Sequence, residues 1–426
     1  MYHTPQPRFR FYGTPQNYLT VIAAILTWQV GHDNDGLDHM ERRFCEWLEA
    51  RHVLALPQAR VGIYLALRYL IRPGQAVILS PYTFFEVINM VVCAGGRPVF
   101  ADIELDTLNI DAQEVKHLID DNTGAVIATH LHGLACDIKM ISEVCRAKGV
   151  ALIEDAAHCF GGRMNGQNVG TYGDVGVFSF SLKKNVNTLY GGMAITSNKD
   201  LRDWMAEELT KFSNENIGRL LRQAGKCLLG DIITTPPLFQ IFTFPMIRFD
   251  FIHNAGKVAK LFRKESQPIL HRELPEHYKR RMTSMQALLA VRQIADVKQH
   301  IKDRLDNARL YHRGLSGLPE VKLPPLRDDG SHIYFAFPIL VSERQNLVRY
   351  MMEQGRDIEE YDYVNAADLL CFSDYARECP NARSAAAQAL LLPIYPGYGK
   401  EEIEKNIATI HNYFGRISNS ACSIAT

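Results

Sequence analysis

The chain has 426 residues, of which 47% are hydrophobic and 22% charged, a composition ordinary for a globular protein. This length indicates two or three domains, with a core large enough to enclose a site. Basic and acidic residues balance at 47 each, so composition gives no support to nucleic-acid binding. Residues 1–16 lack the apolar core of a signal peptide, and the nine cysteines form no CxxC pair. We therefore expect a cytoplasmic protein with reduced thiols.

Short apolar runs alternate with helical patterns from about Arg51 to Ser197. The segment 137–149, for example, has helical spacing and ends in Lys-Gly, as a helix C-terminus does. Strands separated by helices predict right-handed βαβ units and a mostly parallel sheet, in which ligands bind at the carboxyl ends of the strands. The runs predicted as strands are 75–80, 97–103, 124–133, 150–158 and 174–181.

The C-terminal third has a different pattern. A long helical pattern begins at Met282, and the mixed strand and helix patterns at 332–341, 344–355 and 401–414 predict a smaller α+β domain. We therefore expect an N-terminal segment at 1–50, a large domain at 51–274 and a small domain at 275–426.

Residues 201–274 interrupt the alternation. Within them, 227–252 is strongly apolar, but Asp231, Gln240 and the Pro236–Pro237 pair divide it. A membrane span needs about 20 predominantly apolar residues without such interruptions. The sequence favours a buried or dimer-covering insertion, and the alternative is docking on a membrane surface or an amphipathic substrate through 227–252.

Two residues that could do chemistry follow the run "ALIE" at 151–154. Asp155 falls at the end of this predicted strand, where a carboxylate meets a ligand but is costly to bury without a cation or a donor. His158 comes three residues later, within reach of the same ligand. Taken alone, both also fit a helix N-cap and a surface histidine.

Adjacent lysines, Lys183 and Lys184, follow the apolar run at 174–181. A lysine at a strand end can be partly desolvated, which favours its neutral, nucleophilic amine. Such an amine forms a Schiff base with an aldehyde, and an acid that pairs with a pyridinium nitrogen accompanies it in pyridoxal phosphate (PLP) enzymes. Asp155 is the candidate for that acid, whereas the pattern alone does not separate the two lysines.

The remaining parts of a PLP site also have candidates. Phe84, in "SPYTFFEV" at 80–87, could stack on the cofactor ring. The phosphate needs N–H donors at a helix start, and "LPQARVGIYLALRYL" at 56–70 supplies a loop and a helix with Ala59 and Arg60 at the turn. Arg60 could add a charge-assisted contact.

The order of these motifs resembles one family, the fold-type I, PLP-dependent sugar aminotransferases of the DegT/StrS type. The resemblance runs from about Gly31 to Phe414, interrupted at 201–274, and it needs no gap between Glu154 and Gly192. The motifs that carry it are "PVFADIELDTLNID" (98–111), "THLHGLACD" (129–137), "EDAAH" (154–158), "VGTYGDVGVFSFSLKKNVNTLYGG" (169–192), "YKRRMTSMQALLAVRQI" (278–294) and "LLPIYPGY" (391–398).

The resemblance implies a role for each matching residue. Lys184 falls on the Schiff-base lysine, and Lys183 falls on the variable residue before it. Asp155 falls on the partner of the pyridine nitrogen, and His158 falls on the Gln or His beside the ring. The other positions that match cofactor contacts are Ser179, at the phosphate, and Phe84, at the stacking aromatic.

This sequence departs from the family pattern at several cofactor positions. Ala59-Arg60 replaces Gly-Thr in the phosphate loop, and Lys279 replaces an Asn that reaches the phosphate of the neighbouring subunit. Arg60 and Lys279 together could supply the missing donors as positive charge. Beside the lysine, Ser181-Leu182 replaces His-Pro and Leu189-Tyr190 replaces Gly-Glu.

The family implies an activity and partners. Its members transfer an amino group, usually from glutamate, to a keto-sugar nucleotide, and they work as homodimers with the site at the interface. Two rivals keep the fold: a sugar dehydratase, which has His at the lysine position, and a non-catalytic regulatory relative. Lys184 argues against the first, and the presence of both Asp155 and Lys184 argues against the second. A further alternative is an aminotransferase with a lipid-linked or non-sugar acceptor. No metal site is expected.

Overall fold

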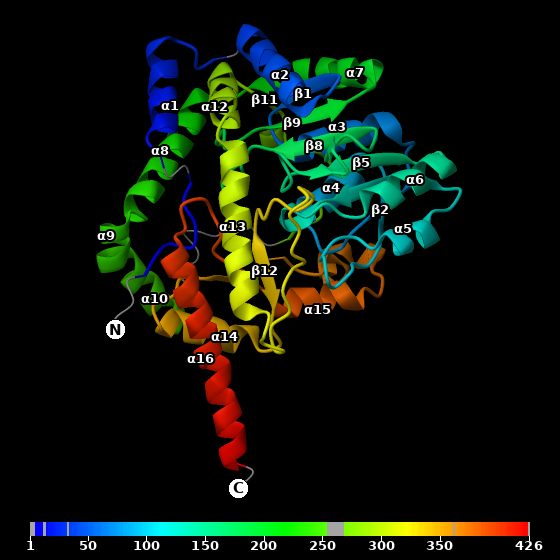
Figure 1. Ribbon diagram of the computed structural model, residues 1–426. Helices are drawn as coiled ribbons and strands as arrows, with labels where there is room; N and C mark the ends of the chain where they lie inside the picture. The colour runs from blue at the N-terminus through cyan, green and yellow to red at the C-terminus, as the bar shows by residue number, and fades with distance from the viewer. Residues whose placement is uncertain (1–4, 12–13, 32–33, 254–267, 361–362, 425–426) are drawn as a thin grey trace.

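The computed structural model describes residues 5–11, 14–31, 34–253, 268–360 and 363–424. Its main feature is a seven-stranded sheet in the order β1-β9-β8-β5-β4-β2-β3 (Figure 1). The run from β8 to β3 is parallel, whereas β9 pairs antiparallel with both β8 and β1. The predicted α/β fold with a mostly parallel, mixed sheet is confirmed. The strands are β1 (His52–Leu56), β2 (Ala76–Leu79), β3 (Arg97–Phe100), β4 (Thr123–Thr129), β5 (Ala151–Asp155), β8 (Val175–Ser179) and β9 (Gly192–Thr196).

Helices cover both faces of this sheet, which is why its strands are apolar throughout instead of alternating. Val77 and Leu79 of β2 pack in one cluster with α3 and α4, whereas Ile78 packs on the other face with α6. The predicted helix at 137–149 is α6, and Gly149 ends it in the left-handed region with φ +64°. The helices of this part are α3 (Ala59–Leu70), α4 (Phe85–Cys93), α5 (Ala112–Leu118), α6 (Ile138–Lys148) and α7 (Lys199–Thr210).

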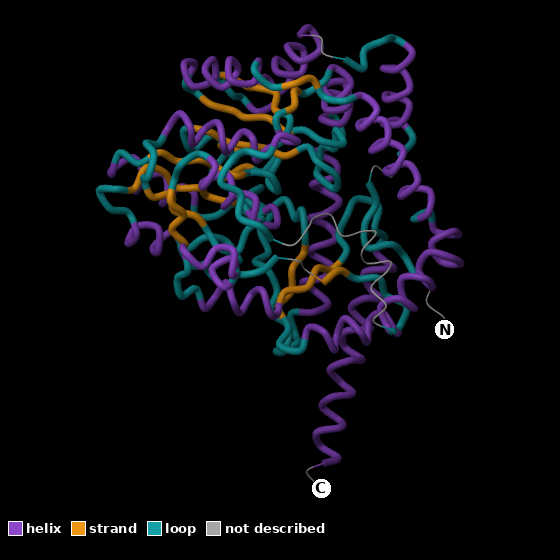
Figure 2. The backbone as a smooth tube through the Cα atoms, turned by 180° about the vertical axis from the view of Figure 1, so that it is seen from behind, coloured by secondary structure: helices purple, strands orange, loops and turns teal. Residues whose placement is uncertain are grey.

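The predicted smaller α+β domain is confirmed in the C-terminal part. An antiparallel sheet in the order β12-β14-β13 packs its apolar residues against α13, α14 and α16. Seen from behind, the strands form two groups, and α16 extends away from the body (Figure 2). These elements are β12 (Phe337–Leu340), β13 (Glu359–Glu360), β14 (Ala389–Leu392), α13 (Val297–Leu315), α14 (Arg344–Glu353), α15 (Pro380–Gln388) and α16 (Lys400–Ile424).

The helical pattern that begins at Met282 forms two helices, because the chain breaks between α12 and α13. In α12, Met285 and Leu289 pack against Val21 of α1 and Leu220 of α8, while Ala290 packs against Phe44 of α2. This helix therefore joins the N-terminal helices to the loop that follows β8. The helices of this group are α1 (Gln16–Leu26), α2 (Asn34–Leu48), α8 (Ile217–Ile233) and α12 (Ser284–Ile294).

The apolar part of 201–274 is helical. After α8 the chain turns into a second helical run, Pro236–Ile252, which is bent by 73° from α8. Among the described residues no single helix is long and apolar enough to cross a membrane, although this bent pair passes on length and composition. The run comprises α9 (Pro236–Leu238), the π-helix η2 (Phe239–Thr243) and α10 (Phe244–Ile252).

Short elements complete the fold. The pairs β6 (Arg163–Met164) with β7 (Gln167–Asn168) and β10 (Ser213–Asn214) with β11 (Arg280–Arg281) are two-stranded ribbons. The 3-10 helices are η1 (Leu131–Gly133), η3 (Glu276–Tyr278), η4 (Ala366–Asp368) and η5 (Leu370–Tyr375).

Candidate active site

The candidate active site begins where three neighbouring strands meet their loops. β5 ends at Asp155, β8 ends at Ser179, and β9 begins at Gly192. Asp155 pairs with Val177 in the sheet, and Ser179 lies opposite Gly192. Because β5 and β8 are adjacent and parallel, their carboxyl ends place the acid of "EDAAH" beside the serine that precedes the lysine pair. Motifs that are separate in the sequence therefore lie together at one edge of the sheet.

Asp155 is buried, with only 6% of its surface exposed. Its Oδ1 accepts a hydrogen bond from the Ala157 backbone N–H at 3.1 Å. Burial raises the pKa of Asp155, while the Ala157 N–H and the charge of Lys184 act to lower it. An ionised carboxylate in this place therefore benefits from a further N–H or cationic donor.

The two lysines of the 181–192 loop point to different neighbours. Lys183 adopts a left-handed backbone conformation with φ +65°. Its Nζ lies 3.5 Å from the ring centroid of Phe9, whereas Nζ of Lys184 lies 4.9 Å from that of Phe335. Lys184 also contributes to the electrostatic environment of Asp155. The structure thus directs the two lysine side chains to different rings, and the charge of Lys184 acts on Asp155.

Side-chain amides and one arginine hold the 181–192 loop in place. Asn185 donates to the Phe160 carbonyl oxygen at 3.1 Å and accepts a hydrogen bond from the guanidinium of Arg304. Gln293 of α12 bonds both sides of Asn187, accepting from its N–H at 3.0 Å and donating to its carbonyl at 2.8 Å. Burial lowers the pKa of Arg304 to about 10, which leaves it charged at neutral pH. The loop that carries Lys184 is therefore preorganised by partners more than 100 residues away.

Gly191 makes the close turn of the same loop possible. Its φ is +147°, and a Cβ at this position would lie 2.3 Å from Oγ1 of Thr188. Any other residue would be strained and would collide with the loop. Steric crowding thus requires glycine at both positions. At Gly191 a side chain would meet Thr188, and at Gly192 it would meet the start of α3.

Phe335 is a site residue that the sequence did not single out. His158 stacks on its ring at a centroid distance of 4.4 Å and an interplanar angle of 19°. The backbone N–H of His132 donates to Nδ1 of His158 at 3.4 Å, which helps to orient the imidazole. Tyr363 lies parallel to the same imidazole at 6.4 Å. The aromatic run "YFAF" at 334–337 was the available signal, but it reads equally well as a buried strand.

The other end of the candidate site is built from backbone. α3 begins at Ala59, as predicted, and a Cβ at Gly192 would lie 2.8 Å from the Ala59 backbone nitrogen. Across the β8–β9 pair from Gly192, Ser179 places its Oγ 3.1 Å from Oγ of Ser181. A helix start and a hydroxyl at one place are suited to an anion such as a phosphate.

Arg60 and Phe84 form a group with Tyr278. The Arg60 guanidinium lies between two rings, 5.0 Å from that of Phe84 and 4.8 Å from that of Tyr278. It donates to the Tyr278 hydroxyl at 2.7 Å and lies 4.0 Å from the Glu86 carboxylate. The ring contacts of Phe84 shown here are with Arg60 and Phe85.

Lys279 lies at the surface of this protomer. Its Nζ pairs with the Glu276 carboxylate at 2.5 Å, and this bond raises its pKa. The adjacent Tyr278 contacts Arg60, so the segment around Lys279 approaches the start of α3 although the lysine itself points to Glu276.

A buried histidine–carboxylate pair supports the floor of the site. Nε2 of His130 and Oε2 of Glu154 are 3.1 Å apart, and both side chains are fully buried. Because the Cys136 N–H donates to Nδ1 of His130 at 3.2 Å, Nε2 carries the proton that is donated to Glu154. Glu154 also accepts from the backbone N–H groups of Gly170, Tyr172 and Gly173. The acid before Asp155 is thus structural, and it fixes the 169–173 turn beside β5.

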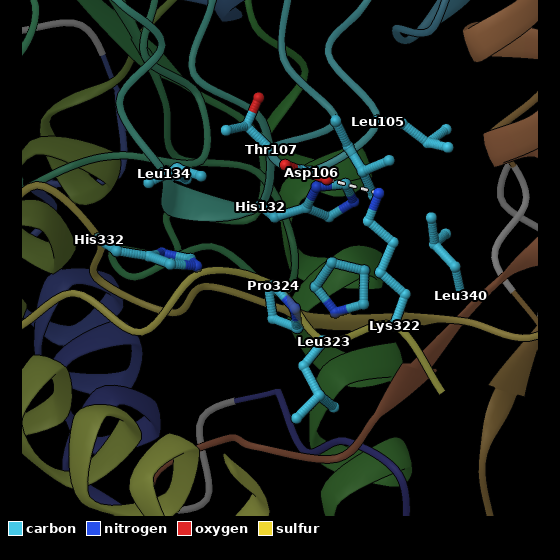
Figure 3. Close-up of a pocket in the computed structure, with 12 residues that line it drawn as sticks. Leu105, Asp106, Thr107, His132, Leu134, Lys322, Leu323, Pro324, His332 and Leu340 are labelled. Carbon is cyan, nitrogen blue, oxygen red and sulfur yellow. Dashed lines mark ion pairs between the residues drawn. The ribbon is translucent and has the colours of Figure 1, made fainter. Parts of the chain in front are cut away.

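His132 and Leu134 of the 131–134 turn help to line a small pocket (Figure 3). His132 and His332 line it, and burial lowers the pKa of each imidazole to about 3, so both are neutral. Asp106 and Lys322 form an ion pair of 2.5 Å at its edge. The predicted site residues do not line this pocket, so it is separate from the candidate active site.

Comparison with proteins of known structure identifies the fold class. The chain aligns with PseC of Helicobacter pylori, an aminotransferase involved in the biosynthesis of pseudoaminic acid, with a TM-score of 0.74 over 97% of this chain and 99% of that one, at 18% sequence identity. The aminotransferase from Psychrobacter cryohalolentis aligns with a TM-score of 0.75 over 95% and 98% of the two chains, at 21% identity. The fold is therefore that of the fold-type I aminotransferases, as predicted.

Sequence comparison gives the family. The model of the DegT/DnrJ/EryC1/StrS aminotransferase family matches residues 16–229 and 248–411, and the chain belongs to this family. A curated relative is GDP-perosamine synthase of Vibrio cholerae, which is 28% identical over 390 residues, or 89% of this chain and 91% of that protein. The predicted enzyme class, an aminotransferase, is confirmed. The family match passes over 230–247, inside the atypical segment expected at 201–274.

Proposed function

We propose that this aminotransferase uses PLP to move an amino group from glutamate to the keto group of a nucleotide-linked sugar. The observation that carries the proposal is the convergence of Asp155 and Lys184 at the carboxyl edge of the sheet, close to the start of α3. A carboxylate, an amine and a set of backbone donors correspond to the three polar ends of PLP, which are its ring nitrogen, its aldehyde and its phosphate.

The residues present fit this cofactor. The buried carboxylate of Asp155, whose pKa is raised by burial, would gain from a protonated ring nitrogen beside it. The missing side chain at Gly192 keeps the Ala59 backbone nitrogen unobstructed, which a Cβ at 2.8 Å would block. Ser179 would add a hydroxyl at the phosphate, and Arg60 at the start of α3 would add positive charge. Phe84, predicted to stack on the ring, and His158, predicted beside it, would complete the proposed cofactor site.

Each side chain has a defined task in the proposed reaction. When bound, PLP supplies a ring that withdraws electrons from the substrate carbon as a proton leaves it. Nζ of Lys184 takes this proton and returns it to complete the transfer, acting as base and then as acid. Asp155 keeps the ring nitrogen protonated. The stacked rings of Phe335 and His158 screen Lys184 from water.

The acceptor class is supported by the relatives. The V. cholerae relative is named for a GDP-linked sugar, GDP-perosamine. A second relative, from Bacillus subtilis, is the spore coat polysaccharide biosynthesis protein SpsC, 25% identical over 88% of this chain and 89% of that protein. A role in cell-surface polysaccharide or secondary-metabolite biosynthesis follows from this proposal, and buried free thiols such as Cys145 and Cys159 support a cytoplasmic location.

An absorbance spectrum tests the proposal directly. Protein purified with PLP should absorb in the visible, and glutamate should bleach this band while 2-oxoglutarate is released. A panel of nucleotide-linked keto-sugars then identifies the acceptor through the mass change that accompanies amination. A protein that stays colourless with PLP would overturn the proposal.

We also infer a homodimer whose active sites are shared, with Lys279 acting on the neighbouring protomer. In its own protomer this lysine pairs with Glu276 at the surface, where it is accessible to a second chain. Mixing a Lys184→Ala protein with a Lys279→Ala protein should restore activity, because one of the two sites in a mixed dimer then carries no substitution. A Lys279→Ala protein with full activity would remove Lys279 from the site.

A further inference from the structure

The bent helix pair of α8 and the Pro236–Ile252 run exposes an unusual number of large apolar side chains. Eight of them are between 39% and 64% exposed. We call this surface the apolar face, and we define it by Leu228, Leu229, Ile232, Leu238, Ile241, Phe242, Met246 and Phe249. Single exposed apolar residues are normal in proteins, but eight on two consecutive helical runs indicate a docking surface.

The acidic and basic residues of the same helix pair differ in exposure. Its two acids are buried, Asp231 at 5% and Asp250 at 7% exposure. Asp231 accepts hydrogen bonds from the Phe11 N–H at 2.9 Å and from the Tyr18 hydroxyl at 2.7 Å, so its charge is used inside the protein. The exposed charged residues of the pair are Arg222, Lys226 and Arg248, all basic.

Two described acids of neighbouring segments are already paired with other arginines. Arg248 donates to the Glu353 carbonyl oxygen at 2.9 Å, and the Glu353 carboxylate is itself paired with Arg349. Arg219, near the start of α8, pairs with Glu215 and contributes no net charge. The apolar face therefore has a basic rim.

We propose that the apolar face docks on the surface of an anionic lipid bilayer. Apolar side chains rimmed by Lys and Arg are the pattern of helices that lie in the membrane interface, where lipid headgroups neutralise the basic residues. Among the described residues neither helical run alone is long and apolar enough to cross the bilayer, and the two are bent by 73° at their break.

A second copy of the chain is the competing occupant, and the charges disfavour it. A two-fold dimer through this face would place the basic residues of one copy, Arg222, Lys226 and Arg248, against the same basic patch of the other. Like charges in contact oppose association, whereas anionic headgroups attract the same three residues. The family match also passes over 230–247, so the centre of this face is an addition to the common family chain. The docking is independent of which donor and acceptor the enzyme uses.

Vesicle flotation of the full-length protein with PLP tests the docking. The protein should float with vesicles of phosphatidylcholine and phosphatidylglycerol, and added salt or vesicles of phosphatidylcholine alone should weaken binding. The triple variant R222Q/K226Q/R248Q should lose affinity for the anionic vesicles by about 10²-fold, at roughly fivefold for each removed charge. The double variant F242S/F249S should lose about tenfold or more.

The controls separate docking from folding and from dimerisation. Leu370→Ser changes an exposed leucine on η5, which contacts β3 and is not part of the apolar face, and it should float as the unchanged protein does. Circular dichroism and melting report whether the variants fold, and the triple variant, which changes only exposed polar residues, serves if the double variant does not. Failure of the unchanged protein to bind anionic vesicles would overturn the proposal. It would also be overturned if F242S/F249S shifted a dimer to monomers by light scattering without changing flotation.

Discussion

The 181–192 loop and the apolar face are built on opposite principles. In the loop, buried amides and a buried arginine bond the backbone at defined distances, and Gly191 and Gly192 are positions where a methyl group does not fit. In the apolar face, eight large side chains are between 39% and 64% exposed, and a Cβ added at Gly225 of α8 would meet nothing within 4 Å. The loop of the proposed cofactor site is thus tightly bonded, whereas the centre of the apolar face lies where the family match passes over 230–247.

Substitution of the two lysines in the 181–192 loop should give the largest effect. Lys184→Ala should lower the transamination rate by on the order of 10³-fold or more, since the proton carrier is removed. The matched change Lys183→Ala removes the contact with Phe9, and it should leave the rate within about threefold. Steady-state kinetics, with borohydride reduction and mass spectrometry of the PLP adduct, measure both. An adduct that persists in Lys184→Ala would reassign the Schiff-base position to Lys183.

Asp155→Asn should have the next largest effect, with a rate loss on the order of 10²-fold because the ring nitrogen loses its acid partner. In the apoprotein, by contrast, the same substitution should not lower the stability at pH 7. The pKa of Asp155 is raised in the folded protein, so its stabilising contribution is present below the unfolded pKa of about 3.9 and is lost as pH rises through the folded value.

The amide variant of the apoprotein should therefore be at least as stable as the unchanged apoprotein at pH 7, and its advantage should shrink toward pH 4. Melting curves of the apoproteins across this range, with and without PLP, provide the measurement. An apo-Asp155→Asn protein that is less stable at pH 7 than at pH 4, relative to the unchanged protein, would contradict the electrostatic account.

A pair of glycine substitutions sharpens the same comparison through stability. Gly191→Ala should destabilise by about 2–4 kcal/mol, because the new Cβ would lie 2.3 Å from Thr188 in a backbone region unsuited to alanine. Gly225→Ala, inside α8 with nothing nearby, should stabilise by about 0.5–1 kcal/mol through helix propensity. Chemical denaturation of both proteins compares them, and equal effects would show that the two regions do not differ in rigidity.

Local patterns predicted the residues that lie at strand ends. Asp155 could be placed because an apolar run ends before it and ligands bind at the carboxyl ends of parallel strands, whereas Ser179 came from the family resemblance. The choice of Lys184 over Lys183 came from motif register, and the structure explains it through the backbone conformation of Lys183. Helix existence was equally accessible, although the break at 295–296 between α12 and α13 was not, because the helical spacing continues across it.

Residues that reach the site through tertiary packing could not be predicted. Phe335 and Arg304 come from the C-terminal part and meet the site only after more than 100 intervening residues fold. The buried acid Glu154 was visible in the sequence, but its three backbone donors belong to a turn whose geometry no periodicity encodes. The exposure of the apolar face was likewise undetermined, since an apolar helix is compatible with either a buried or an external position.

The left-handed backbone of Lys183 makes the direction of the amine proposed to be reactive depend on the residue before it. One residue with φ +65° turns the chain so that two adjacent side chains diverge, one toward Phe9 and one toward Phe335. Position 183 can therefore vary widely in charge, but it cannot accept a β-branched side chain without turning its successor away from Asp155. The direction of the Lys184 side chain thus depends on the backbone conformation of the residue before it.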